Sequence, residues 1–462
     1  MILGRPKKAF EKLKKQKREE KRMSKKALKV VVSVMLIAAL IVSVFGLVQG
    51  NLTASASTQK TVKIKFLSNL PDRTSNQGKL EQMLIDSYMK ANPNVKIEVE
   101  ALQDEPYKQK FKVYVATNQM PDIFMVWGQP SFFLPVMKAG YAAEIKLDQI
   151  KDYGFKTSSL KDFMYNGKLY GLPRNTDFMV LYYNKGLFNK YKVKVPTTFD
   201  ELLNAAKVFR KNGIAPIAIN GKDKWILAIL YQELVVKESG DQKLIYDAIS
   251  KKSVAKNQIL LKAAKDLVNL VNVGGFQDAF VAADYGAANN LFAQEKAAMY
   301  YMGSWEVGMA ANPNFSESFK KNVDATYFPI ISGGKGKKTD ILAWHGGGYA
   351  VSASSKVKNE AMKLLLYMMH PTRWAKIGWQ QGLVVPGQNW EKFMTGKETV
   401  LQKKLTQIFS SATSVSGTVW QDAFTPNFKT EAETLCQMLV AKAITPEKFL
   451  AKIEELAKLE VK

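Results

Sequence analysis

The amino-acid sequence predicts an α/β protein whose sheets of mostly parallel strands are flanked by helices. Strand and helix patterns alternate along residues 62–126, an order typical of a parallel sheet covered on both faces. The 462 residues are 47% apolar and 23% charged, as in folded chains, and their number predicts two or three compact units. One cysteine, Cys436, and two histidines exclude an intramolecular disulfide and a zinc site built from Cys and His.

The first elements follow from hydrophobic periodicity. Apolar residues alternate with lysines after Thr61, which predicts a strand, and the next apolar residues recur at helical spacing until Asn92-Pro93-Asn94 ends the helix. The pattern then repeats. The predicted order is a strand at 62–66, a helix at 80–88, a strand at 95–99, a helix at 107–115 and a buried strand at 123–126.

Three later helices carry recognisable end signals. Thr198 and Glu201 form a capping box that begins a helix ending at Gly213. The apolar run 361–369 predicts a helix that stops before a proline, and Thr445-Pro446-Glu447 begins a C-terminal helix.

The N-terminal segment predicts export. Residues 1–29 hold 13 Lys or Arg and three Asp or Glu, whereas residues 30–56 hold no charge. The uncharged run Val30–Val48 and the small residues Ala54-Ser55-Ala56 complete the pattern of a signal peptide cut after Ala56. Translation from Met1 and from Met23 both fit this pattern.

An uncleaved membrane anchor at Val30–Val48 is the alternative, since 19 apolar residues can span a bilayer. Both interpretations place residues from Ser57 onward outside the membrane, because positive charge flanks the cytoplasmic side. No cysteine lies in this segment, which excludes a lipoprotein anchor.

The positive charge is not concentrated in a nucleic-acid site. Residues 1–29 carry +10 of the chain's net +26, which leaves +16 for the remainder. After the first segment the lysines are dispersed, without a dense basic run containing aromatic residues. This pattern predicts a solvated basic surface and no nucleic-acid partner, and a partner-specific basic patch is the alternative.

Common catalytic and cofactor motifs are absent. The sequence has no G-x-G-x-x-G, P-loop, H-E-x-x-H or G-x-S-x-G, and Gly333-Gly334-Lys335-Gly336 lacks the P-loop spacing. We therefore expect no cofactor, no metal and no catalysis. A glycosidase using two carboxylates needs no fixed spacing, so an exported carbohydrate-active hydrolase or lyase stays open as the alternative.

Tryptophans in polar or glycine-rich settings indicate a carbohydrate site. Ligands of open α/β sheets bind beyond the carboxyl ends of strands, where an indole offers a flat apolar face to a sugar ring. Trp127 follows a strand in this way, and Trp305 stands in Gly303-Ser304-Trp305. Trp225 and Trp344 have similar flanks, whereas Trp374, Trp379 and Trp390 are expected to pack in the core.

A series of segments across residues 60–460 has a familiar order and spacing. They are Pro121–Trp127, Gly167–Pro173, Val180–Phe188, Pro196–Leu202, Glu295–Met299 with Gly303-Ser304-Trp305, and Gly346–Ser352. With them the sequence resembles the extracellular solute-binding proteins of bacterial ABC sugar importers, the family that includes maltodextrin-binding proteins. The resemblance implies a two-lobed, type II periplasmic-binding-protein-like fold, with hinge crossings and closure on a ligand.

The resemblance also implies boundaries and ligand contacts. Lobe 1 is expected at 57–177 and 346–395, and lobe 2 at 178–345 and 396–462, after the basic segment 1–29 and the signal or anchor region 30–56. The expected ligand-binding residues are Asp72, Arg73, Trp127, Arg174, Asp177, Trp225, Trp305, Trp344, His345 and Trp420. The three consecutive glycines 346–348 suit a backbone that bends or lies close to ligand.

The predicted function is capture of a carbohydrate, expected to be an oligosaccharide, for an ABC permease. Its partners are then the sugar and the permease subunits, with the membrane touched through the N-terminal segment if that segment is uncleaved, and the family default is a monomer. Arginines and lysines in the cleft would favour an acidic sugar. A surface protein that holds anionic wall polymers is a further alternative, distinguished by steep loss of binding in salt.

Overall fold

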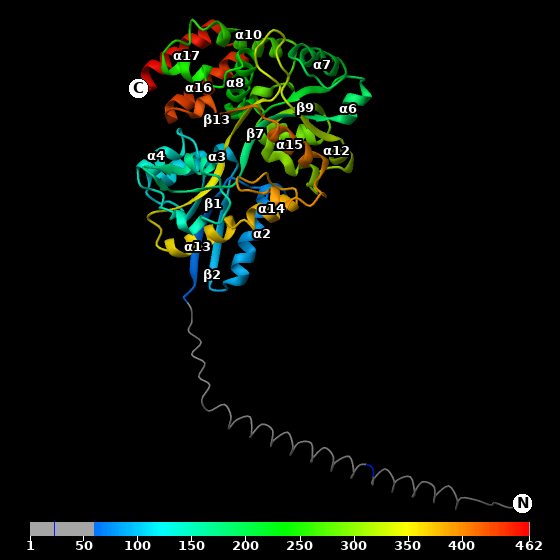
Figure 1. Ribbon diagram of the computed structural model, residues 1–462. Coiled ribbons are helices and arrows are strands. Elements are labelled where there is room, and N and C mark those ends of the chain that lie inside the picture. The colour runs from blue at the N-terminus through cyan, green and yellow to red at the C-terminus, as the bar shows by residue number, and fades with distance from the viewer. Residues whose placement is uncertain (1–22, 24–59, 462) are drawn as a thin grey trace, which may run out of the picture. The chain divides into compact units, whose positions relative to one another are not determined.

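The computed structural model describes Met23 and residues 60–461, and a compact unit begins at Thr61 (Figure 1). The predicted basic segment, apolar segment and cleavage site lie outside the described residues, apart from Met23. No helix in the described part of the chain combines the length and the apolar character needed to cross a membrane.

The first sheet confirms the strands and helices predicted for residues 62–126. Its five strands have the order β2-β1-β3-β12-β6, and β1 runs parallel to β2 and to β3. Antiparallel β12 lies between β3 and β6. The strands are β1 (Val62–Ser68), β2 (Val95–Ala101), β3 (Ile123–Trp127), β6 (Leu172–Pro173) and β12 (Gly347–Val351), and their helices include α2 (Asn76–Ala91), α3 (Asp104–Ala116), α4 (Phe133–Lys138), α13 (Lys358–Met369) and α14 (Trp374–Gln380).

The second sheet is mixed, which corrects the expectation of mostly parallel strands in each lobe. Its order is β13-β11-β7-β9-β8, with β10 also paired to β7. The strand β7 is antiparallel to β9, β10 and β11, whereas β8 and β9 are parallel. The neighbours of β7 are distant in sequence, so no local pattern gives their direction. The strands are β7 (Thr176–Asn184), β8 (Ala215–Ala218), β9 (Ala297–Gly303), β10 (Val323–Thr326), β11 (Asp340–His345) and β13 (Ser414–Gly417).

Helices surround the second sheet, and the predicted end signals are present. Thr198 caps α7, and Glu201 completes the capping box. The predicted helix at 361–369 is α13, and the C-terminal helix is α17. The helical segments are α6 (Lys185–Lys190), α7 (Phe199–Lys211), α8 (Trp225–Ser239), α9 (Leu244–Ser250), α10 (Gln258–Asn272), α11 (Tyr285–Ala293), η5 (Ser304–Ala311), α12 (Glu317–Asn322), α15 (Val400–Ser410), η7 (Trp420–Asp422), α16 (Pro426–Val440) and α17 (Pro446–Glu460).

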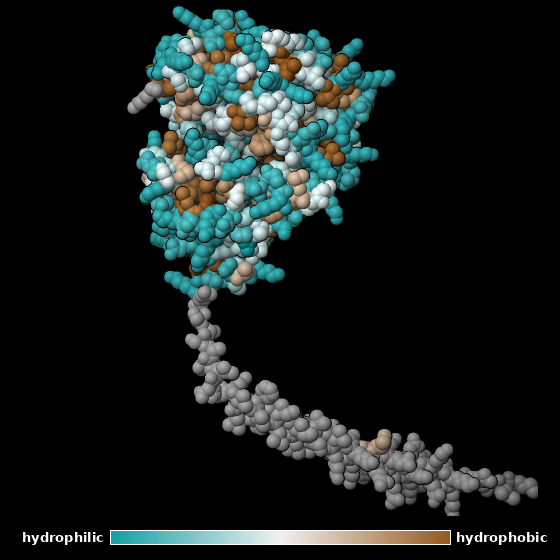
Figure 2. Space-filling view, viewed as in Figure 1, coloured by the Kyte–Doolittle hydropathy of each residue, from teal (hydrophilic) through white to brown (hydrophobic). Residues whose placement is uncertain are grey.

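Two separate hydrophobic cores define two lobes. The first lobe, around β1, buries side chains from 64–172 and 349–384, and the second lobe, around β7, buries side chains from 178–344 and 385–457. The lobe boundaries expected from the sequence, at residues 177–178, 345–346 and 395–396, stay a prediction. The face shown in Figure 2 is mostly hydrophilic, with apolar residues in small groups.

Three tryptophans pack as predicted. Trp374 is fully buried and donates a hydrogen bond from its indole nitrogen to the backbone oxygen of Arg174, 2.8 Å away. Trp379 and Trp390 stack on each other with ring centroids 4.2 Å apart. These residues therefore stabilise the fold and are unavailable as ligand-stacking surfaces.

Candidate functional site

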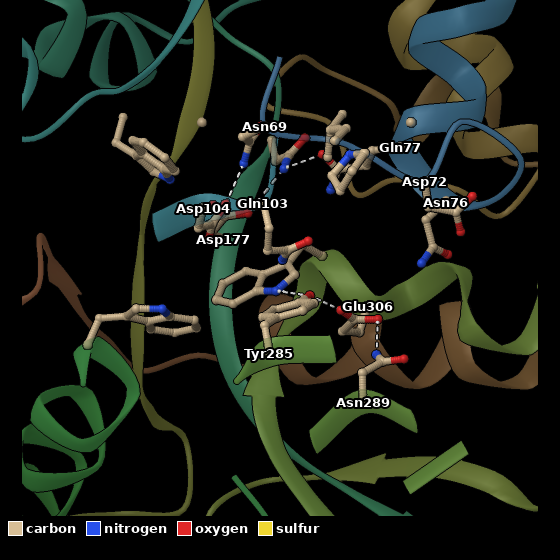
Figure 3. A pocket seen from close by; sticks show the side chains of 18 of the residues that line it. Asn69, Asp72, Asn76, Gln77, Gln103, Asp104, Asp177, Tyr285, Asn289 and Glu306 are labelled. Atoms are coloured by element: carbon tan, nitrogen blue, oxygen red, sulfur yellow. Dashed lines mark hydrogen bonds between the residues drawn. The ribbon is translucent and has the colours of Figure 1, made fainter. Parts of the chain in front are cut away.

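A cavity lies between the two lobes and is lined by residues of both (Figure 3). The first lobe contributes the loop after β1, the start of α2 and the end of β3. The second contributes α8, α11, η5, β11 and η7. The cavity amounts to about 1640 Å³, including its opening to solvent. Seven of the ten predicted ligand-binding residues line it: Asp72, Trp127, Arg174, Asp177, Trp225, Trp305 and Trp344.

Indole rings from both lobes meet at this cavity. Trp305 contacts Trp225 and Trp344, with ring centroids 6.0 and 6.1 Å apart and planes tilted by 55° and 61°. Trp127 comes from the first lobe, where Tyr107 and Phe132 pack edge-on against it. The rings of the second lobe form an aromatic wall, and Trp127 adds a ring from the other side of the cleft.

The glycine before Ser304-Trp305 has a local cause. A Cβ atom on Gly303 would lie 1.9 Å from the ring of Trp305. Any side chain at this position would therefore displace the indole. The Gly-x-Trp motif keeps the ring folded back against the end of β9, beside the cavity.

A buried polar network holds Arg174 at the cavity. Its Nη2 donates to Oδ1 of Asn69 at 2.8 Å, and Asn69 donates to Oδ1 of Asp104 at 2.9 Å. Its Nη1 donates to the hydroxyl of Tyr349 at 3.3 Å, and that hydroxyl is bonded to Glu81. Burial raises the pKa of Asp104, although neighbouring Lys108 and Asn69 act to lower it.

Asp177 is the second residue of β7, just after the chain leaves the first lobe. Its Oδ1 accepts a hydrogen bond from Nδ2 of Asn175 at 3.3 Å, and the same nitrogen donates to Gln77 at 3.1 Å. Burial raises the pKa of Asp177 to about 6, although the charge of Arg174 and the bond from Asn175 oppose this rise. The carboxyl group is therefore ionised at neutral pH and protonated in mild acid.

The glycines at 346 and 347 are required for close packing against these two side chains. A Cβ atom on Gly346 would lie 1.6 Å from Oδ2 of Asp177, and one on Gly347 would lie 2.8 Å from Nε of Arg174. Neither glycine has a positive φ. The glycine run therefore serves close approach to the site, and no unusual backbone conformation is involved.

A second polar network supports the aromatic wall (Figure 3). Nε1 of Trp305 donates to the hydroxyl of Tyr285 at 3.1 Å, and that hydroxyl is bonded to Oε1 of Glu306. Nδ2 of Asn289 donates to Oε2 of Glu306 at 3.1 Å. Burial raises the pKa of Glu306 to about 8.

Several buried polar atoms at the cavity have no hydrogen-bond partner among residues 60–461. They are Oδ1 of Asn76, Nε of Arg174, Oδ1 of Asn175, and both amide atoms of Gln421. Unpaired buried polar atoms cost stability unless another molecule satisfies them. The site therefore offers both donors and acceptors beside its indole faces.

Direct hydrogen bonds join the lobes on two sides of the cavity. The hydroxyl of Ser131 donates to Oδ1 of Asp422 at 2.5 Å, and the amide of Ser131 donates to the backbone oxygen of Asp422 at 3.0 Å. Nδ2 of Asn312 donates to the hydroxyl of Ser75 at 3.2 Å. The described conformation is one in which the lobes are in contact.

Three predicted residues, Arg73, His345 and Trp420, are not among those that line the cavity, so their contact with a ligand stays a prediction. Trp420 is fully buried in the second core, where its indole nitrogen donates to the backbone oxygen of Ala228 at 2.8 Å. Arg73 turns to Glu81 and to Gln82, whose Oε1 is 3.0 Å from its Nε. His345 follows Trp344 in β11, and successive strand residues point to opposite faces.

Asp72 lines the cavity, but it also organises its own loop. Its Oδ1 accepts bonds from the amide and the hydroxyl of Thr74, at 2.8 and 2.7 Å, and its Oδ2 is bonded to Ser75. Partial burial acts to raise the pKa of Asp72, but these hydrogen bonds outweigh it and the pKa is lowered. Most of its capacity to accept hydrogen bonds is used within the loop.

Comparison with known proteins identifies the family. The model of the bacterial extracellular solute-binding protein family matches residues 71–372. A multiple sugar-binding protein of Streptococcus mutans is 26% identical over 327 residues, covering 68% of this chain and 73% of that protein. A structure from work on xylan utilisation by the thermophilic bacterium Caldanaerobius polysaccharolyticus is 30% identical, has a TM-score of 0.77 and covers 85% of this chain and 99% of its own.

A second solved structure shares the fold. A sugar transporter from Bacillus licheniformis in complex with stachyose is 20% identical, has a TM-score of 0.66 and covers 85% of this chain and 98% of its own. The predicted two-lobed α/β fold is confirmed by these similarities. The chain belongs to the family of bacterial extracellular solute-binding proteins.

Proposed function

We propose that the protein binds an oligosaccharide between its lobes and delivers it unaltered to the permease subunits of an ABC importer. The observation that carries this proposal is the meeting of Trp127 with Trp305 and its neighbours at one cavity. Indole faces stack on the C–H faces of sugar rings, and the polar atoms between them suit hydroxyl groups. The presence of several indole rings along the cavity favours a ligand of more than one sugar unit.

The relatives support a sugar as ligand. One is named for binding multiple sugars, one was studied for xylan utilisation, and one holds stachyose. The family consists of binding proteins, which supports a role without catalysis. Asp72 gives no support to a hydrolase, because Thr74 and Ser75 already occupy its carboxylate oxygens.

A neutral sugar fits the charges of the cavity better than an acidic one. Arg73 does not line the cavity, and Arg174 is engaged by Asn69 and Tyr349. Lys429 lines it but is paired with Asp422 at 2.7 Å and with Glu433 at 2.8 Å. An anionic ligand would have to compete with these partners.

Binding and delivery depend on closure of the lobes about the chain crossings, one of them in β7. A ligand between the lobes adds contacts to both, so it favours the closed form. The protein would act as a monomer outside the cell, released after cleavage or held by its N-terminal segment.

Thermal unfolding of the protein against a saccharide panel tests this proposal. A ligand that binds the native state raises the melting temperature with concentration. We expect a rise with neutral oligosaccharides such as stachyose and xylotetraose, a smaller one with uronate-containing saccharides, and recovery of the saccharide intact. Cleavage of the saccharide, or no rise with any member of the panel, would contradict the proposal.

A further inference from the structure

Glu306 is a buried acid in the lining of the cavity, and it has no cationic partner among residues 60–461. Its carboxyl oxygens bind the hydroxyl of Tyr285 and the amide of Asn289, both on α11. The side chain is 3% exposed, and no salt bridge within residues 60–461 includes it. Such a group is stable when neutral, because an isolated charge is costly to bury.

Among the described residues, no cationic group near Glu306 offsets its charge. From β7, Tyr182 donates its hydroxyl hydrogen to the backbone oxygen of Gly303 rather than to Glu306. The helices α2, α12 and α15 also pack against η5. Burial, and not a neighbouring charge, raises the pKa of Glu306. The charged residues of these three helices are Lys79, Glu81, Asp86, Lys90, Glu317, Lys320, Lys321, Lys403 and Lys404.

The protonation of Glu306 decides which hydrogen bonds Tyr285 can make. A neutral Glu306 can donate its proton to the oxygen of Tyr285, which also accepts from Trp305 at 3.1 Å. The hydroxyl hydrogen of Tyr285 is then free to bond a hydroxyl group in the cavity that Tyr285 lines. An ionised Glu306 accepts only, so Tyr285 must donate to it and is lost as a donor to the ligand.

We propose that neutral Glu306 is a positioning residue that keeps Tyr285 available as a donor and fixes the plane of Trp305, so that its ionisation weakens ligand retention. This inference rests on the proposed function, because the weakened step is saccharide binding. We therefore expect alkaline pH to weaken saccharide binding, because Tyr285 must then donate to ionised Glu306.

Tryptophan emission of the ligand-free full chain tests the network without any saccharide. Because Trp305 is bonded to Tyr285, we expect the emission to titrate between pH 7 and 9.5 in the wild type. The titration should vanish in Glu306→Gln, whose amide donates at every pH, and in Trp305→Phe. Asp266→Asn is the matched control: burial raises the pKa of Asp266 to about 7, but it lies on α10 and does not line the cavity. Persistence of the transition in Glu306→Gln would overturn the proposal.

Binding of stachyose at pH 7 and pH 9 provides the second test. If the neutral form alone binds well, the Kd of the wild type rises roughly tenfold between these pH values, because the competent fraction falls by that factor. We expect a ratio of about one in Glu306→Gln and in Tyr285→Phe, and the wild-type ratio in Asp266→Asn. A pH-dependent Kd that Glu306→Gln leaves unchanged would overturn the inference while leaving the proposed function intact. If stachyose does not bind, the emission titration still decides the inference.

Discussion

Ser131 of the first lobe is bonded twice to Asp422 of the second, through its hydroxyl at 2.5 Å and its amide at 3.0 Å. Asp422 directly follows Gln421, whose unpaired amide borders the cavity, and Lys429 holds its carboxylate at 2.7 Å. Asp422, which is bonded across to the other lobe, is therefore adjacent in sequence to Gln421, which lines the cavity. Both the bond between the lobes and part of the cavity lining therefore come from η7.

Removing the Ser131 hydroxyl should shorten the lifetime of the closed complex. Hydrogen bonds to charged groups contribute about 1.5–3 kcal/mol, so Ser131→Ala should weaken saccharide binding by roughly 10–100-fold. The loss should appear in the dissociation rate measured by stopped-flow fluorescence. Ser159→Ala is the control, since Ser159 is buried and donates to the backbone oxygen of Lys156 within the first lobe. An unchanged dissociation rate in Ser131→Ala would exclude this contact as a latch.

Substitution at Gly346 should disturb Asp177 directly. The added Cβ atom would overlap Oδ2 of Asp177, so Gly346→Ala should destabilise the protein by about 1–3 kcal/mol and weaken binding. Gly286→Ala is the control for stability, because its Cβ atom would lie 3.8 Å from Oδ1 of Asp284, an ordinary van der Waals contact. Denaturant unfolding measures the stability of both variants. Equal stability of the two variants would show that the approach at Gly346 is not required.

Gln421→Leu should change stability and affinity in opposite directions. The leucine removes two unpaired buried polar atoms, so the ligand-free protein should gain about 1–3 kcal/mol, whereas saccharide affinity should fall by about tenfold or more. Gln402→Leu is the control, because the amide of Gln402 donates to Trp379 and accepts from Thr399. It should lose stability and keep its affinity. A loss of stability in Gln421→Leu would contradict a ligand-facing role.

Acid should weaken binding through Asp177. Its pKa is raised to about 6 by burial, and its carboxylate accepts hydrogen bonds, so affinity should fall by about tenfold per pH unit below 6. Stability should move the other way. The native state binds this proton more tightly than the unfolded chain, so the contribution of Asp177 to stability falls as pH rises from about 4 to about 6.

Asp177→Asn should abolish the acid dependence of the Kd, measured by titration calorimetry from pH 5 to pH 7. Asp162→Asn is its control, because burial also raises the pKa of Asp162 to about 6 but this residue does not line the cavity. A Kd that is constant across this range in the wild type would remove Asp177 from the ligand contacts.

Local patterns predicted the elements and part of the site. Trp127 and Trp305 were identifiable because a strand end and a glycine mark their exposure to the cleft. Trp420 also has polar neighbours, yet its ring enters the core and Gln421 borders the cavity instead. The adjacent positions cannot be told apart without the direction of η7.

Residues that depend on distant packing escaped prediction. Glu306 and Tyr285 look like ordinary surface residues in sequence, but Glu306 is buried and Tyr285 partly buried where η5 meets α11. The antiparallel neighbours of β7 likewise come from segments more than a hundred residues apart, such as β9 and β11. The one signal for Glu306 in the sequence is its position directly after Trp305.

Titration calorimetry of the full chain with stachyose, xylotetraose and the other panel saccharides tests the central claim most directly. We predict stoichiometric binding of at least one of them, weakened by about 1.4 kcal/mol or more, roughly tenfold, in Trp127→Ala and in Trp305→Ala. Trp390→Phe, whose ring stacks on Trp379, should bind as the wild type does. Full affinity in both alanine variants would contradict a sugar held between aromatic faces of the two lobes.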